Sequence, residues 1–190
     1  MNWKNHVAKI LPKLSRACYA VRAMYYFSSL DMLKMIYFAY IHSVINYGII
    51  FWWNSSESNK ILLAQKKIVR IMTASRPKTY CKPLFQSLGI MTITSQYSIS
   101  LIKFLLKNQE KFTSNTEVHN ISMRNKLKLH KTISILILYQ KGVYYMSIRI
   151  FNKLPDCIAR LVENKRSFIS TLRQYLTSKS IYFLEEFFDD

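Results

Sequence analysis

The sequence contains little glycine, proline or cysteine, and each shortage excludes a class of protein. Three glycines and four prolines in 190 residues are too few for the many turns of a β-sandwich or a β-barrel. Three cysteines, Cys18, Cys81 and Cys157, lie far apart and form no C-x-x-C pair. An odd, scattered set of this kind indicates reduced thiols in a cytosolic or nuclear protein rather than a disulfide framework.

Acidic residues are also scarce, and this shortage dominates the electrostatics. The chain has 10 Asp and Glu against 28 Lys and Arg, which gives a formal net charge of +18. Because such an excess of one sign repels itself in a compact fold, it favours a polyanionic partner. Nucleic acid is the first candidate and anionic lipid the second.

The most apolar stretch runs from Leu33 to Trp53, and Asp31, with Ser29 just before it, is a suitable N-cap. A helix that is apolar all round lies either in a protein core or in a membrane. Lys34, His42 and Asn46 interrupt this stretch, and the remaining apolar runs are short for a membrane span. We therefore expect a buried central helix, with a membrane-associated protein anchored by residues 33–53 as the alternative.

The N-terminus lacks the order of a secretory signal, in which a charged region precedes an apolar one. The first thirty residues carry five basic side chains and no acidic one, so a mitochondrial address stays open. We expect a cytoplasmic or nuclear protein.

Apolar residues elsewhere recur at steps of three and four, which is typical of amphipathic helices. In the first of these, residues 3–25, Pro12 predicts a kink or two short helices end to end. Ser58 is a suitable N-cap for a helix over residues 59–73. Pro83 suits the first turn and Gly89 the C-terminal cap of a short helix over 83–88. Thr92 or Thr94 can cap the helix that continues to about residue 111. The expected helices cover residues 3–25, 33–53, 59–73, 83–88, about 92–111, 143–152 and a last stretch that carries Phe168, Leu172, Tyr175 and Leu176.

The fold class predicted from these patterns is mainly α, an irregular helical bundle around the central helix. Residues 112–120 are expected to form a polar loop. Leucines alternate with basic residues over 123–131, which predicts an exposed strand or an extended segment. The second half of the chain could therefore contain a short strand pair. Ile133–Tyr139 fits a buried strand or a buried helix equally well. We divide the chain into residues 1–111 and 112–190; the second part ends in an acidic tail that either folds back on basic helices or stays frayed.

Two sets of cations predict phosphate contacts. The helix over 59–73 has a basic stripe opposite its apolar side, and no acidic residue occurs from residue 60 to residue 82. The first set is Lys60, Lys66, Lys67, Arg70, Arg76, Lys78 and Lys82, and the second is Arg124, Lys126, Lys128 and Lys131. A solvated helix face is the alternative interpretation of such a stripe.

The order of several short blocks resembles the region downstream of the polymerase core in jockey-like non-LTR retrotransposon reverse transcriptases. The resemblance covers essentially the whole chain. The blocks are the stretch 33–53 with Y-x-A-Y-I-H-S-x-I-x-Y-G-I-I-F-W, Gln65–Met72, Tyr80–Phe85, the stretch from Arg124 to His130, Tyr139–Tyr145, Phe151–Pro155, and Asn2–His6.

This resemblance implies the thumb-like, C-terminal part of an RNA-directed DNA polymerase, a product of a transposable element. In the family the metal-binding aspartates lie upstream, in the fingers and palm, and catalysis needs carboxylates that hold two metal ions. Before residue 156 this chain has only Asp31, Glu57, Glu110 and Glu117. Phe187–Asp190 imitates the family's aromatic-x-Asp-Asp motif, but we interpret it as an acidic tail because no strand follows it.

The resemblance thus predicts a truncated polymerase that is inactive alone, with no catalytic residues, no metal site and no cofactor. The expected partner is RNA or an RNA–DNA duplex, bound through its phosphates, and a polymerase core supplied in trans is a second candidate partner. An orphan gene fragment without selected activity is the alternative to this function.

Overall fold

A computed structural model describes residues 3–116 and 128–189, and these residues form a mainly helical protein. The chain packs as two compact units, Met1–Tyr97 with Leu176–Asp190, and Ser98–Tyr175. The mainly α class predicted from the sequence is confirmed. Among the described residues no strand forms, and one antiparallel bridge joins Ser114 to Leu129. Most of the stretch 123–131, which was predicted to be extended, lies outside the described residues. The division of the sequence after residue 111 stays a prediction.

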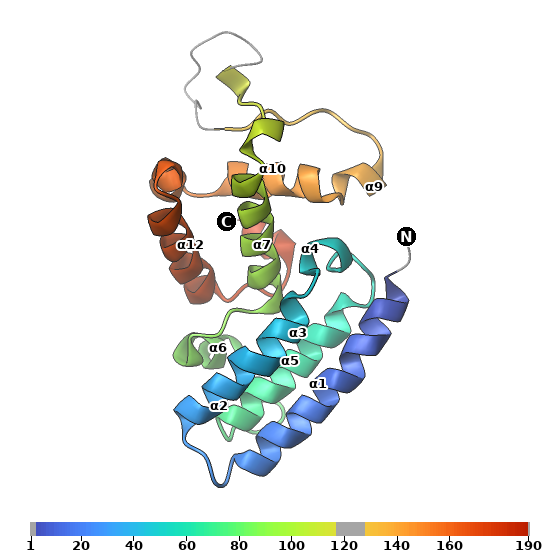
Figure 1. Cartoon of the computed structure of the whole chain (residues 1–190), viewed down its shortest axis with the longest axis vertical. Coiled ribbons are helices and arrows are strands. Elements are labelled where there is room, and N and C mark those ends of the chain that lie inside the picture. Colours follow the sequence, from blue (N-terminus) through green and yellow to red (C-terminus); the bar gives the residue numbers. More distant parts are fainter. Residues whose placement is uncertain (1–2, 117–127, 190) are drawn as a thin grey trace. The chain divides into compact units, whose positions relative to one another are not determined.

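The first unit is built from helices that pack along one another (Figure 1). The long helix α1 packs against α5 and, through smaller contacts, against α2, η1 and α3. Apolar residues spaced two helical turns apart, such as Val7, Leu14 and Val21, turn inward from α1 and are at most 1% exposed. Its elements are α1 (Lys4–Met24), α2 (Leu30–Ile36), the π-helix η1 (Tyr37–His42), α3 (Ser43–Asn46), α4 (Ile49–Trp52), α5 (Ser58–Met72), α6 (Lys82–Leu88), the start of α7 (Ile93–Lys107), the end of α12 (Lys165–Lys179) and α13 (Leu184–Asp189).

The second unit packs the rest of α7 and α12 with shorter helices. Ile148 and Phe151 of α10 are buried, as is Phe168 of α12, whose ring centroid lies 6.5 Å from that of Phe151. Phe112 stacks on Tyr144, with ring centroids 4.6 Å apart. The other elements of this unit are η2 (Gln109–Lys111), α9 (Ile137–Gln140), α10 (Val143–Lys153), α11 (Asp156–Ala159) and η3 (Arg160–Glu163).

The segment expected as one helix buried on all sides is instead a series of short helices with one buried face. Tyr37, Ile41 and Ile45 are fully buried, whereas Tyr47 on the other side is 76% exposed. The left-handed conformation of Gly48, with φ +62°, separates α3 from α4. The expectation of burial all round was wrong because its neighbours cover only one side of this segment: α1 packs against α2, η1 and α3, and Gln65 of α5 donates to the Tyr37 hydroxyl.

Several helix ends follow the local sequence signals. Ser29, rather than Asp31, caps α2, since its hydroxyl accepts a hydrogen bond from the Met32 amide at 3.3 Å. Gly89 ends α6 with φ +66°, and the Thr92 hydroxyl accepts from the Ser95 amide at 3.2 Å at the start of α7.

Two local predictions need correction. Ser58 does not cap α5 but begins it, and its hydroxyl donates to the Ser55 carbonyl at 3.0 Å. Pro12 does not divide α1 into two helices, since α1 runs from Lys4 to Met24 with Pro12 inside it on an exposed position, and a kink at Pro12 stays a prediction.

The apolar run Ile133–Tyr139 is not buried. Ile133 is 97% exposed and Ile135 is 92% exposed, and the run is irregular until the single turn of α9. A run that is apolar on both sides needs neighbours on both sides to be buried, and the described part of this unit does not cover it.

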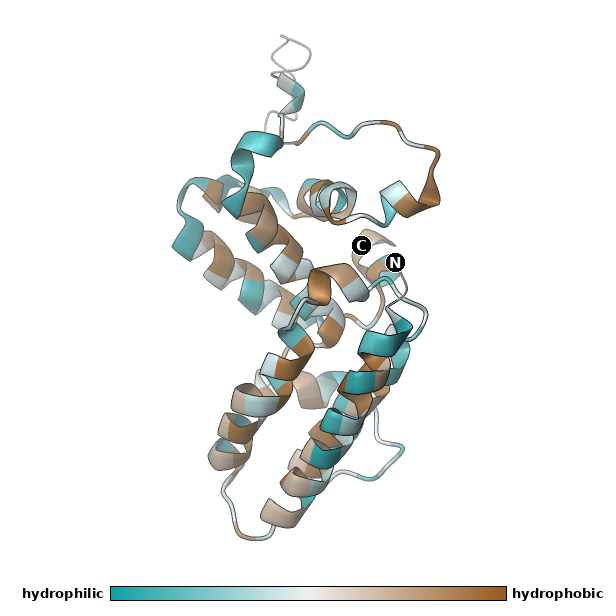
Figure 2. Cartoon of the chain, turned by 45° about the vertical axis from the view of Figure 1, so that its right-hand side comes forward, coloured by the Kyte–Doolittle hydropathy of each residue, from teal (hydrophilic) through white to brown (hydrophobic). Residues whose placement is uncertain are grey.

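The helices of the first unit carry hydrophilic and hydrophobic residues together (Figure 2). None of the helices formed by the described residues combines the length and the apolar character needed to cross a bilayer.

Candidate nucleic-acid interface

The structure separates the seven cations of the first predicted set by their surroundings. Lys67 on α5 and Arg76 and Lys78 in the loop after it are exposed. Lys60 is also exposed but forms an ion pair with Glu57, and this pairing holds the pKa of the Glu57 carboxyl below its usual value. Three cations of this set are therefore exposed without a partner among the described residues.

The other three cations of this set are partly buried in contacts within the first unit. The Arg70 guanidinium donates from Nε to the Thr79 carbonyl at 3.0 Å. The Lys66 ammonium lies 3.5 Å from the centroid of the Tyr182 ring, and the Lys82 ammonium lies 2.6 Å from a carboxylate oxygen of Glu186. Burial lowers the pKa of Lys66 from its ordinary value. Arg70, Lys66 and Lys82 are less available to a phosphate than their sequence positions suggest.

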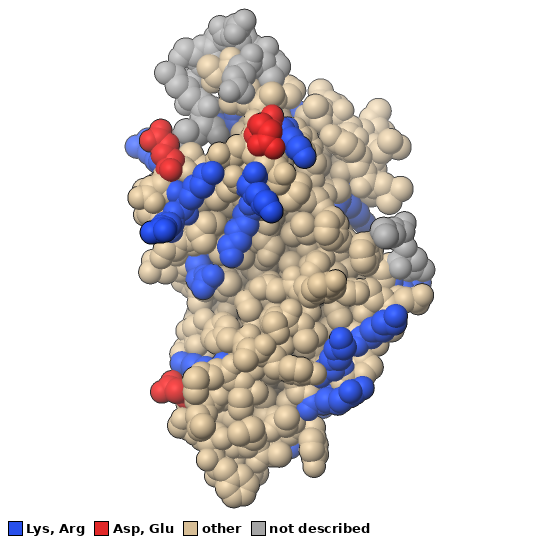
Figure 3. Space-filling model, in the orientation of Figure 1, with Lys and Arg blue, Asp and Glu red and all other residues tan. Residues whose placement is uncertain are grey.

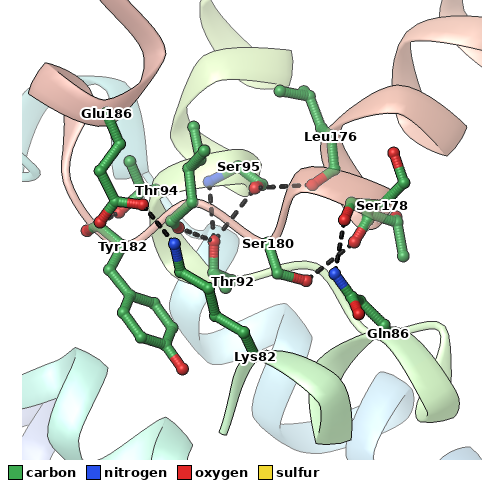
Figure 4. Close-up of polar contacts among 12 residues, drawn as sticks. Lys82, Gln86, Thr92, Thr94, Ser95, Leu176, Ser178, Ser180, Tyr182 and Glu186 are labelled. Carbon is green, nitrogen blue, oxygen red and sulfur yellow. Dashed lines mark hydrogen bonds and ion pairs between the residues drawn. The ribbon is translucent and has the colours of Figure 1, made fainter. Parts of the chain in front are cut away.

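The C-terminal segment is held where it meets these lysines by hydrogen bonds to its backbone (Figure 4). The hydroxyls of Thr92 and Thr94 donate to the carbonyls of Ile181 and Tyr182 at 2.5 and 2.6 Å. The Gln86 amide donates to the Ser178 carbonyl at 2.6 Å. Because Thr92 and Thr94 are fully buried, these bonds fix the segment firmly.

This arrangement decides between the two predicted states of the acidic tail. Glu186 of α13 reaches back to Lys82 of α6, so the tail folds back onto a lysine at the start of a helix that carries no other charge. Phe187 of the same helix is buried, at 4% exposure. The sequence could not identify Glu186 as the partner, since the two residues are 104 positions apart.

The second predicted set is described only in part. Arg124 and Lys126 lie outside the described residues. In the second unit Lys128 is half-buried, and Lys131 is exposed with its ammonium 5.6 Å from the Tyr145 ring centroid. The structure therefore places only Lys131 of this set on an open surface.

A basic surface that the sequence analysis did not select lies on α1. Lys9, Lys13, Arg16 and Arg22 are all exposed, and α1 contains no acidic residue. Figure 3 shows a group of Lys and Arg side chains over the position that α1 has in Figure 1. The absence of acid from residue 1 to residue 30 was the available sequence signal.

A second unselected surface lies on α12 in the other unit. Lys165, Arg166 and Arg173 are exposed and line a shallow hollow of about 460 Å³ together with Ile169 and Ser170. Basic residues thus line open surfaces in both units.

Comparison with known proteins finds no matching family model, no matching curated protein and no matching solved structure. Within residues 3–116 and 128–189, His, Cys, Asp and Glu side chains do not gather in threes that could bind a metal ion.

Proposed function

We propose that this chain binds nucleic acid through its phosphates without reading sequence, as the non-catalytic, thumb-like part of a retrotransposon reverse transcriptase. The family named in this proposal rests on the sequence resemblance to jockey-like enzymes. The proposed ligand is RNA or an RNA–DNA duplex, and we propose that the chain joins no nucleotides by itself.

The observation that carries this proposal is exposed positive charge on two stretches, residues 1–30 and 60–82, that contain no acidic residue. In the first unit Lys9, Lys13, Arg16 and Arg22 on α1, with Lys67, Arg76 and Lys78, present seven exposed cations. Flexible cations of this kind neutralise phosphates and release counterions, which gives affinity without sequence preference.

Salt dependence tests the proposal. If about six phosphates are neutralised, the logarithm of the binding constant falls by about five for each tenfold rise in salt. Fluorescence anisotropy with two RNA duplexes and one RNA–DNA hybrid of unrelated sequence, at several salt concentrations, measures this slope. A flat salt response would remove the phosphate-contact proposal.

A triple variant then tests the surface. Replacing Lys67, Arg76 and Lys78 by Gln should reduce the slope by up to about 2.7 and weaken binding to all three duplexes alike. The matched control replaces Lys103, Lys107 and Lys153, three exposed lysines of the second unit, and changes the net charge equally. Equal effects of the two triples would show that net charge alone sets the affinity and that the assigned surface is wrong.

The non-catalytic role has a separate test. The purified chain, given a primed RNA template, deoxynucleotides and Mg²⁺, should incorporate no label. Incorporation by the chain alone would refute a non-catalytic role.

A further inference from the structure

A groove lies between α1 and α3 in the first unit, next to the basic surface of α1. Its volume is about 380 Å³, within the range of pockets that hold small ligands. Its walls are apolar at Ile10 and Val44, aromatic at His6 and Tyr47, and basic at Lys9 and Lys13.

None of the residues that line the groove is acidic, and two of them are lysines. No acidic residue occurs in α1, and none occurs between Asp31 and Glu57, the region that contains α3. Lys9 and Lys13 are four residues apart and therefore lie on the same face of α1. Two neighbouring ammonium groups of this kind fit a phosphate or two successive phosphates.

Tyr47 provides an aromatic surface beside these lysines. Its side chain is 76% exposed, although its backbone is fixed. The Trp52 indole donates to the Tyr47 carbonyl at 2.9 Å, and the left-handed turn at Gly48 follows directly. The His6 ring, which also lines the groove, has its centroid 6.3 Å from that of the Tyr47 ring. An exposed ring on a fixed backbone is a suitable platform for stacking a base.

From this placement we propose that the groove binds one nucleotide of a single-stranded nucleic acid, with its base on Tyr47 and its phosphates on Lys9 and Lys13. This inference rests on the proposed function and adds a preference for single strands. Ser43 forms part of the wall and is not a ligand, because its hydroxyl already donates to the carbonyls of Ala39 and Tyr40. The groove fits a nucleotide better than an acidic peptide, since a peptide carboxylate would leave the Tyr47 ring unused.

The test compares oligouridine of about 12 nucleotides with an RNA duplex of equal length, because only unstacked bases can reach Tyr47. Tyr47→Ala should weaken oligouridine binding about 5-fold to 100-fold and duplex binding less than about 2-fold. Tyr47→Trp should restore the affinity for oligouridine. Tyr19→Ala is the matched control, since Tyr19 lies on α1 outside the groove and is also 76% exposed.

Two further measurements locate the contacts. Replacing Lys9 and Lys13 by Gln should lower the salt slope for oligouridine by about 1.4, and by more than the same change at Arg16 and Arg22. Photocrosslinking with 5-iodouridine in the oligonucleotide should attach to Tyr47, as read by mass spectrometry of the digested protein.

The possible results distinguish a failure of this inference from a failure of the proposed function on which it rests. If wild type binds neither RNA form, the proposed function fails and the groove site fails with it. If wild type binds both with a steep salt response but Tyr47→Ala is unchanged, or equals Tyr19→Ala, only this inference is overturned. Binding to phosphatidylglycerol vesicles that requires Tyr47, with oligouridine binding unaffected by Tyr47→Ala, would overturn it in favour of a lipid surface.

Discussion

Gln65 is a buried polar residue that connects several elements of the first unit. It is fully buried, and its amide nitrogen donates to the Tyr37 hydroxyl at 2.7 Å and to the Met91 carbonyl at 3.0 Å. Its amide oxygen accepts from the Ile93 backbone N–H at 2.9 Å. One side chain thus connects α5 to η1, to the turn before α7 and to the start of α7.

We expect Gln65→Met to destabilise the first unit by about 2–4 kcal/mol. Methionine conserves the length of the side chain, so the loss measures hydrogen bonds rather than a cavity. The Ile93 N–H is left buried without its acceptor, which costs about 1–3 kcal/mol, and the lost bond to Tyr37 adds about 1 kcal/mol. Met91 contributes less, because its carbonyl still accepts from Gln96 at 2.9 Å.

Urea unfolding followed by tryptophan fluorescence measures this change, because the three tryptophans, Trp3, Trp52 and Trp53, all belong to the first unit. Gln174→Met, at an exposed position, is the control and should shift stability by less than about 0.5 kcal/mol. Combining Gln65→Met with Tyr37→Phe should cost less than the sum of the two single changes. A loss below about 1 kcal/mol for Gln65→Met would refute the reasoning.

Two further predictions concern charge. Burial raises the pKa of Tyr37 from 10.0 to about 12, so the unfolded chain loses this proton first. The stability that this group contributes is therefore present below about pH 10 and is lost, by roughly 3 kcal/mol, as the pH rises through 12. Urea midpoints at about pH 8 and pH 11 should differ less in Tyr37→Phe than in wild type. Glu186→Gln should release Lys82 and raise the salt slope for duplex RNA by up to about 0.9. The control is Glu185→Gln, at an exposed carboxylate without an ion pair among the described residues, which should change the slope less. Equal changes in the two variants would contradict a specific contact between Glu186 and Lys82.

The sequence by itself determined the helices and most of their ends. Steps of three and four residues create an apolar side on any helix, and capping by Ser29 or Gly89 needs only neighbours along the chain. These features were predictable because they depend on residues within one or two helical turns.

Only the tertiary structure decided which side chains are covered and by what. It buried Lys66 against Tyr182, paired Lys82 with Glu186, and left Lys67 exposed on the same helix as Lys66. It also left Tyr47 exposed, because the helices packed against the apolar segment cover one side of it. The covering residues come from distant parts of the chain, and hydrophobic burial does not depend on sequence separation, so no local pattern could reveal them.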